Sequence, residues 1–201
     1  MHDGRCHTLR TCWVPRAEVE KTETAPIEGV ELSMQALGEL PDGDAAHTAL
    51  QPLVDRYREW IARQQAAAAQ LPPHQRETAG ILLANAGIAA NRIERGIAAL
   101  AANDAVLDAF RVANRAVGAA LRRRLEIDDP GWRAFQLAFM LVNLPGIADP
   151  GDVDRETVDL LFFPTGGGKT EAYSSVSPRS RWCCGACAIR RPGRAQAPAS
   201  A

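Results

Sequence analysis

One glycine-rich segment constrains this chain more than any other: residues 162–171 read FFPTGGGKTE. It ends an apolar run, residues 158–163, whose β-forming side chains predict a strand buried on both faces. Glycines have no Cβ atom, so several backbone N–H groups can turn towards one phosphate, and a helix that begins here adds free amides and the positive end of its dipole. The segment therefore predicts a binding site for a nucleoside triphosphate.

Each residue of this segment has an expected role. Lys169 supplies a cation for the β- and γ-phosphate oxygens, and the Thr170 hydroxyl is placed to ligate the accompanying Mg²⁺. The usual pattern has a glycine where Phe163 stands, so the loop is a variant Walker A motif. The predicted cofactor-binding residues in the loop are Pro164, Thr165, Gly166, Gly167, Gly168, Lys169, Thr170 and Glu171. No catalytic residue is predicted.

Composition excludes several other classes of protein. A net charge of −1 gives no overall attraction to nucleic acid, so DNA binding would need a local basic patch. No apolar run approaches the length of a membrane span and the N-terminus does not resemble a signal peptide, which predicts a cytoplasmic location without membrane contact. The five cysteines lie near the two ends and lack the further ligands of a zinc site. They are Cys6, Cys12, Cys183, Cys184 and Cys187.

The first two thirds of the chain predict a helical bundle. Residues 1–43 have no sustained periodicity and are expected to form an irregular, partly ordered arm. Residues 44–127 are expected to form three amphipathic helices, the last with Asn103 as N-cap. The expected apolar positions of the three helices are Leu50, Val54, Tyr57 and Ile61; Leu82, Ala86, Ala89, Ile93, Ile97 and Leu100; and Val106, Phe110, Ala113, Val117, Leu121 and Leu125.

Residues 122–124, three arginines at the end of the third helix, leave two interpretations open. They form a basic patch that suits nucleic acid. Arginine in a last helical turn also complements the helix dipole and keeps that end solvated, which is the interpretation we prefer.

Residues 128–173 predict the start of a second domain. After a turn, Trp132 to Leu144 is apolar nearly all round, which indicates a buried helix, and residues 143–146 and 149–152 predict a loop before the strand. Gln136 lies in this helix, downstream of an arginine and an aromatic residue. An amide side chain offers the donor and the acceptor that pairing with adenine requires.

The loop and the Gln136 region together resemble those of superfamily-2 helicases and DNA translocases. Residues 109–116, 132–139 and 161–173 narrow the resemblance to the large helicase of the bacterial DISARM anti-phage system, over roughly residues 50–173. In that family a Phe before the Pro-Thr-Gly-Gly-Gly-Lys-Thr string is expected. The resemblance implies an incomplete RecA-like α/β domain in a mainly α chain, ATP and Mg²⁺ as cofactors, adenine recognition by Gln136, and DNA and other DISARM components as partners of the full-length relative.

The sequence changes character after Tyr173. Pro178 and a cluster of serines interrupt the helix that should follow the loop. We therefore expect residues 174–201 to be a disordered tail, produced by a frameshift or truncation of the gene near Tyr173.

These observations predict an ATP-binding N-terminal fragment of a helicase. No Asp-Glu pair on an apolar strand follows Thr170, so we expect no ATP hydrolysis by this polypeptide alone. Two alternatives stay open: a helical protein-interaction module with a vestigial phosphate loop, or a fragment of another P-loop ATPase.

Overall fold

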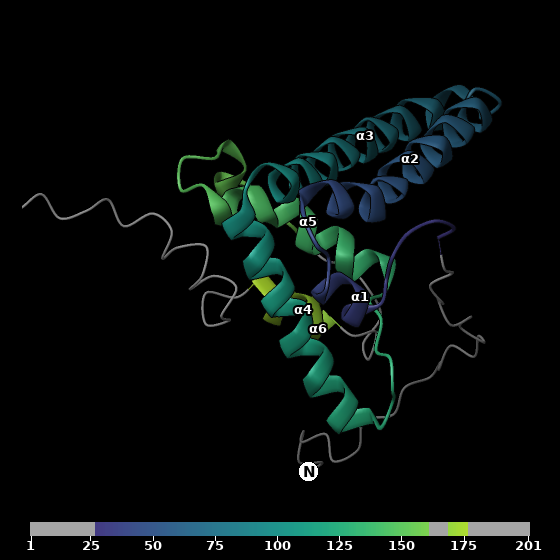
Figure 1. The fold of residues 1–201 in the computed structure, drawn as a ribbon. Coiled ribbons are helices and arrows are strands. Elements are labelled where there is room, and N and C mark those ends of the chain that lie inside the picture. The colour runs from purple at the N-terminus through teal and green to yellow at the C-terminus, as the bar shows by residue number, and fades with distance from the viewer. Residues whose placement is uncertain (1–26, 161–168, 177–201) are drawn as a thin grey trace, which may run out of the picture.

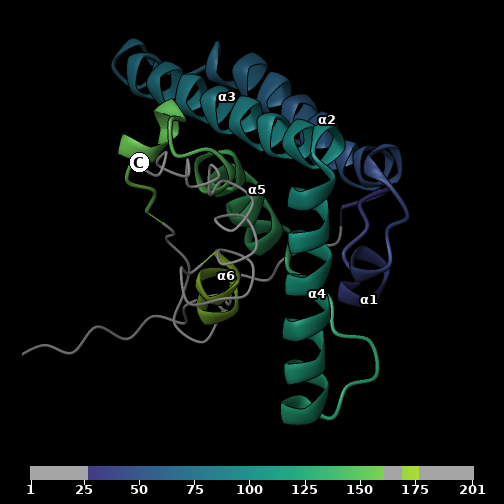
Figure 2. The ribbon, with the colours of Figure 1, turned by 60° about the vertical axis from the view of Figure 1, so that its left-hand side comes forward.

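The computed structural model describes residues 27–160 and 169–176, and these are mainly α, as the sequence predicts. Figure 1 shows a long antiparallel hairpin formed by α2 (Gly43–Ala68) and α3 (Pro73–Ala102). Helix α4 (Asp104–Leu125) leaves the end of this hairpin and runs crosswise to it (Figures 1 and 2). The short helix α1 (Met34–Gly38) packs on α4, while α5 (Ala134–Ala148) lies against α3. The 3₁₀-helix η1 (Val153–Glu156) and α6 (Lys169–Val176) follow.

Local sequence explains where these helices begin. The Asn103 side chain accepts hydrogen bonds from the backbone N–H groups of Ala105 and Val106, at 3.0 and 3.3 Å, which confirms it as the N-cap of α4. Ser33 and Asp42 cap α1 and α2 in the same way. Each cap satisfies amides that the first helical turn leaves without an intrahelical partner.

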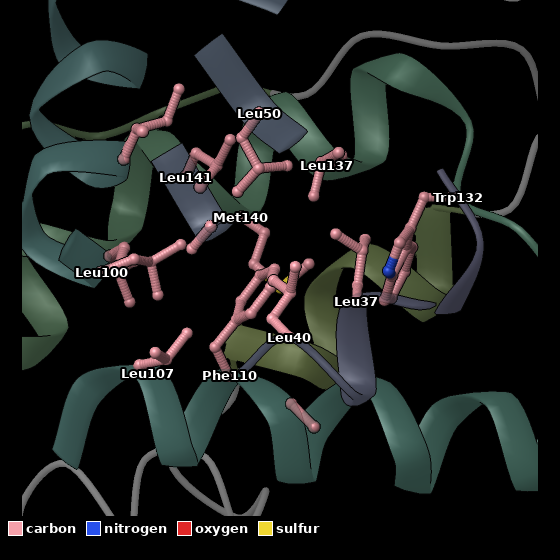
Figure 3. Packing of buried hydrophobic residues seen from close by; sticks show 14 of the residues in the cluster. Leu37, Leu40, Leu50, Leu100, Leu107, Phe110, Trp132, Leu137, Met140 and Leu141 are labelled. Atoms are coloured by element: carbon pink, nitrogen blue, oxygen red, sulfur yellow. The ribbon is translucent and has the colours of Figure 1, made fainter. Parts of the chain in front are cut away.

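A single hydrophobic core joins α1 to α5. Figure 3 shows Phe110 of α4 and Met140 of α5 in this core, together with Leu100 near the end of α3. All three side chains are fully buried. The core thus includes residues beyond position 127, where the sequence predicts the end of the bundle. It also includes residues of α1, which lies within the segment 1–43 that the sequence predicts as an irregular arm. The division into domains stays a prediction.

The apolar stripes of the helices are buried over only part of their length. Positions near the crossing with α5, such as Ile93 and Ile97, are buried as predicted. Leu82 and Leu125, which the sequence places on the apolar stripes of the second and third helices, are 63% and 53% exposed and do not belong to the core. Leu82 lines a hollow between α2 and α3, which Trp60 also lines, and Leu125 is the last residue of α4. Figures 1 and 2 show how far the hairpin and α4 extend from α5.

Helix α5 differs from its prediction at both ends. It begins at Ala134 and not at Trp132, and it continues through the predicted loop at residues 143–146 to Ala148. Pro145 has no N–H to donate to the Leu141 carbonyl, yet the last turn still closes because the Asp149 N–H donates to Pro145 O at 2.8 Å. The backbone of α3 approaches closely here: a Cβ atom on Gly96 would lie 2.1 Å from the Leu141 oxygen.

The predicted strand is not formed in the part of it that the structure describes. Residues 157–160 have no regular secondary structure, and Val158 and Leu160 are 94% and 87% exposed. A strand needs a neighbour to accept and donate its backbone hydrogen bonds, and the described residues contain no strand. The rest of the run and the glycine-rich loop, residues 161–168, lie outside the described residues. The start of a RecA-like α/β domain therefore stays a prediction.

Candidate functional site

Three of the predicted cofactor-binding residues lie in the first turn of α6. Lys169 is the first residue of the helix and is half-buried, and Thr170 beside it is exposed. A helix that begins directly after the glycine-rich loop is the arrangement that a phosphate-binding loop requires, because the first-turn amides lack intrahelical partners. The other predicted loop residues, Pro164 to Gly168, lie outside the described residues.

Helix α6 is fixed by its contact with α5. Ala172 is fully buried, and the rings of Phe139 and Tyr173 meet edge to face with centroids 5.4 Å apart. The helix continues through Ser174 and Ser175 to Val176, three residues further than the sequence predicts. Serine is only a moderate helix former, but it is tolerated in a last turn, and Pro178 comes two residues after Val176, where a proline commonly follows the end of a helix. Residues 177–201 lie outside the described part.

An ion pair joins α6 to α4. Arg124 Nη2 donates to Glu171 Oε1 at 2.6 Å, and the Glu171 side chain is only 14% exposed. The hydrogen bond from Arg124 lowers the pKa of Glu171 against the opposing effect of burial, and the charge of Arg133 adds to the lowering. Glu171, the last residue of the predicted loop motif, is therefore ionised and held by an arginine from the bundle.

A pocket of about 280 Å³ lies between the same two helices. Its apolar wall is formed by α4, and its polar wall by Arg124, Thr170 and Glu171. Thr170, the predicted Mg²⁺ ligand, therefore faces α4 of the bundle across this pocket. Sequence patterns alone do not reveal this neighbourhood, because residues 124 and 171 are separated by 47 positions.

Gln136 has a structural role in α5. Its side chain is 5% exposed, and its Oε1 accepts a hydrogen bond from the Arg133 backbone N–H at 2.8 Å, which caps the start of the helix. Pairing with adenine would use the same amide group. The recognition of adenine by Gln136 stays a prediction.

The three arginines at the end of α4 have different surroundings. Arg122 donates to Asp128 O at 2.9 Å and to Gln35 Oε1 at 3.0 Å, and Arg124 binds Glu171. Arg123 is exposed. Two of the three side chains therefore tie the end of α4 to neighbouring segments, which is closer to the structural interpretation than to a free basic patch.

A second group of ion pairs fixes the segment upstream of the loop to α3. Arg92 donates two hydrogen bonds to Asp159, at 2.5 and 2.7 Å, and a third to Asp154 at 3.2 Å. Arg95 donates to Asp154 at 2.6 Å and also binds Asp152. The Arg92 side chain is 12% exposed, and its hydrogen bond to Asp159 raises its pKa further above its ordinary value.

This cluster is not predicted from the sequence. Two sequence features hint at the cluster. Several aspartates occur within residues 149–159, just before the loop, and two arginines stand close together at residues 92 and 95. Nothing in the sequence pairs residues that are 67 positions apart.

The described residues contain no group of side chains of metal-binding type. In residues 27–160 and 169–176, no three His, Cys, Asp or Glu side chains are arranged to hold a metal ion. All five cysteines lie outside these ranges. No helix in the same ranges has both the length and the hydropathy that a membrane span needs.

Comparison with known proteins gives one informative match. No protein-family profile matches the chain. The chain is 30% identical over 195 residues to the DISARM protein DrmA of Bacillus paralicheniformis, an alignment that covers 84% of this chain but 17% of that protein. The chain therefore spans less than a fifth of the length of its relative, and it is a distant homologue of DISARM protein DrmA over that part.

Proposed function

We propose that this chain is an ATP-binding part of a DISARM-type anti-phage helicase or translocase. The observation that carries the proposal is the position of Lys169 and Thr170 in the first turn of α6, directly after a glycine-rich sequence, in a homologue of DrmA. In the longer relatives, DNA and further DISARM components are the proposed partners. Among the described elements, α6 alone combines the start of a helix with residues of a phosphate-binding motif.

The residues present fit ATP and Mg²⁺. Lys169 carries a cation at the start of a helix, where the positive end of the helix dipole lies, and both features attract phosphate oxygens. The exposed Thr170 hydroxyl is the ligand that such loops offer to Mg²⁺. Bound Mg²⁺ would neutralise charge on the phosphates. Residues 165–168 are proposed to supply backbone N–H groups, and Gln136 is proposed to recognise adenine.

The pocket between α4 and α6 supports the same assignment. It lies beside Thr170, and the ion pair between Arg124 and Glu171 forms its polar wall. Glu171 keeps its negative charge at neutral pH, and Arg124 holds that charge in one place and compensates it, which limits its repulsion of a phosphate bound near Thr170. The ion pair thus holds α6 in one orientation beside the pocket.

Binding of a fluorescent ATP analogue with and without Mg²⁺ tests the proposal. Wild-type chain should bind the analogue more tightly with Mg²⁺, and Thr170→Ala should remove most of that Mg²⁺ dependence. Thr78→Ala is the matched control, because Thr78 is an exposed helical threonine in α3, far along the chain from the loop. Equal Mg²⁺ dependence in wild type and Thr170→Ala would contradict the proposal.

A helical interaction module is the second candidate function, and one observation favours it. The α2–α3 hairpin exposes large apolar side chains: Trp60, Ile81, Leu82 and Ile88 are between 42% and 63% exposed. No charged residue occurs between Thr78 and Asn91. If this candidate is correct, Leu82→Ser should weaken binding to another DISARM component, measured by calorimetry with the purified partner, whereas Lys169→Ala should leave that binding unchanged.

A further inference from the structure

Two arginines of the helical bundle hold the two ends of the segment that contains the candidate phosphate loop. Upstream, Arg92 of α3 binds Asp159; downstream, Arg124 of α4 binds Glu171. Asp159 precedes the glycine-rich string by seven residues and Glu171 follows it by three. The two contacts come from different helices, and each joins residues at least 47 positions apart in sequence.

We propose that Arg92 and Arg124 are positioning residues for nucleotide binding, which fix Asp159 and the first turn of α6 relative to the bundle. This inference rests on the proposed function. A phosphate site made of backbone N–H groups is effective only when those groups are held in place before the ligand arrives. Because both ends are anchored to the same folded body, the distance between them varies less, and the loop between them loses less entropy when it closes around a ligand.

The upstream anchor is the stronger of the two. Arg92 is only 12% exposed and grips both carboxylate oxygens of Asp159, a two-point geometry that also fixes orientation. Arg92 is also bonded to Asp154, which Arg95 shares. The downstream arginine is 60% exposed, so its bond to Glu171 is screened by water and contributes less.

The downstream anchor acts on the helix that carries the phosphate ligands. Glu171 is one residue beyond Thr170 and two beyond Lys169, so its position sets the rotation of the first turn. Edge-to-face packing of Tyr173 on Phe139 fixes the same helix from α5. Together these contacts place α6 against α4 and α5, and the bundle therefore determines where Lys169 and Thr170 stand.

Hydrogen exchange without nucleotide tests the positioning directly. In Arg124→Ala, amides of α6 should exchange faster than in wild type, and in Arg92→Ala the hydrogen-bonded amides of Arg155 and Thr157 should exchange faster. Arg123→Ala is the matched control, because Arg123 is exposed in the same turn of α4. Arg92→Lys should restore part of the protection, since lysine keeps the charge but not the two-point grip on Asp159. Arg124→Lys should also restore part of it, since lysine keeps the charge opposite Glu171. Unchanged exchange in both alanine variants would overturn the inference.

Affinity for Mg·ATP on the full 201-residue chain separates this inference from the proposed function. We expect the dissociation constant to rise about 2- to 5-fold in Arg124→Ala, the range of an exposed ion pair. In Arg92→Ala it should rise about 10-fold, within the usual range of coupling between sites. The lysine variants should lie between alanine and wild type, and Arg123→Ala should match wild type.

The possible outcomes are distinct. Tight binding by wild type and both alanine variants, with binding lost in Lys169→Ala, would support the proposed function and overturn the positioning role. No binding by wild type would overturn the proposed function and the nucleotide part of this inference together. An altered circular dichroism spectrum in Arg92→Ala would signal loss of the fold, in which case Arg92→Lys and the Arg124 variants decide the result.

Discussion

Asn114 and Trp132 form a polar contact inside the apolar core. Asn114 is fully buried; its Nδ2 donates to Phe110 O at 2.9 Å, and its Oδ1 accepts from Trp132 Nε1 at 2.7 Å. The contact joins α4 to the residues that precede α5. The arrangement selects one register of these two elements, because a shift would leave the indole N–H buried without an acceptor.

Asn114→Ala should lower the free energy of unfolding by about 1–3 kcal/mol, the usual cost of leaving a buried donor unpaired. Asn143→Ala is the matched control: Asn143 of α5 makes the same kind of bond to a carbonyl four residues earlier, at 2.8 Å, but is only half-buried. Urea unfolding followed by circular dichroism measures both values. Equal losses in the two variants would show that the indole contact contributes nothing.

The charge of Glu171 should contribute to stability in a pH-dependent way. Its pKa in the folded chain is lowered from 4.5, chiefly by the hydrogen bond from Arg124. A group with a lowered folded pKa stabilises the fold at pH values above its ordinary pKa, and that contribution is lost as the pH falls through the folded value. The melting temperature of Glu171→Gln should therefore be lower than that of wild type near pH 7, and the difference should shrink below about pH 4.5. A difference that stays constant from about pH 7 to about pH 3.5 would contradict this assignment.

Helices α3 and α5 meet at a glycine that the sequence alone does not single out. A Cβ atom on Gly96 would lie 2.1 Å from the carbonyl oxygen of Leu141, closer than any side chain can approach without moving the backbone. Pro145 cannot donate to that oxygen within α5. Helix α3 therefore comes closest to α5 at the Leu141 carbonyl, which receives no hydrogen bond from residue 145 because that residue is proline.

Gly96→Ala should destabilise the chain by about 1–3 kcal/mol or more, because the core must shift to admit the methyl group. Gly80→Ala in the same helix is the matched control, since no atom lies within 4 Å of the position that its methyl group would take. That variant should gain up to about 1 kcal/mol from the better helix propensity of alanine. Opposite signs in chemical unfolding are expected, and a stabilised Gly96→Ala would rule out the close contact.

Helical elements were predictable from sequence where their signals are local. The N-cap at Asn103 and the 3.6-residue apolar stripes through Leu50, Ile97 and Phe110 depend only on residues that are close in the sequence. The exposure of Leu82 was not predictable, because burial depends on which other helices reach that part of the hairpin. The ends of α5 were misjudged for a related reason: Pro and Gly usually stop a helix, but contacts with α3 support this one.

In the candidate site, too, some residues are predictable from a local motif and others are not. Lys169 and Thr170 at the start of a helix follow from the motif, since a glycine-rich string before Lys-Thr has a local physical meaning. Arg92 and Arg124 do not follow from it, because they reach Asp159 and Glu171 only through the packing of α3 and α4. The strand expected at residues 158–160 depends equally on neighbours that the described residues do not contain.

At the scale of the whole molecule, the helical part and the candidate nucleotide-binding part are joined through one core and two sets of ion pairs. The core runs from α1 to α5, and α6 packs on α5. Ligand binding at the first turn of α6 should therefore stabilise the entire described fold and not α6 alone. At a Mg·ATP concentration about 100 times the dissociation constant, the gain should be about 2.7 kcal/mol, visible as a single shifted melting transition. Two separate transitions, with only one shifted, would contradict this coupling.

Titration calorimetry of Mg·ATP into the purified 201-residue chain tests the central claim most directly. Saturable binding at one site is expected in wild type and its loss in Lys169→Ala, with both proteins giving the same circular dichroism spectrum. Heat of binding that is absent in wild type, or equal in wild type and Lys169→Ala, would contradict it.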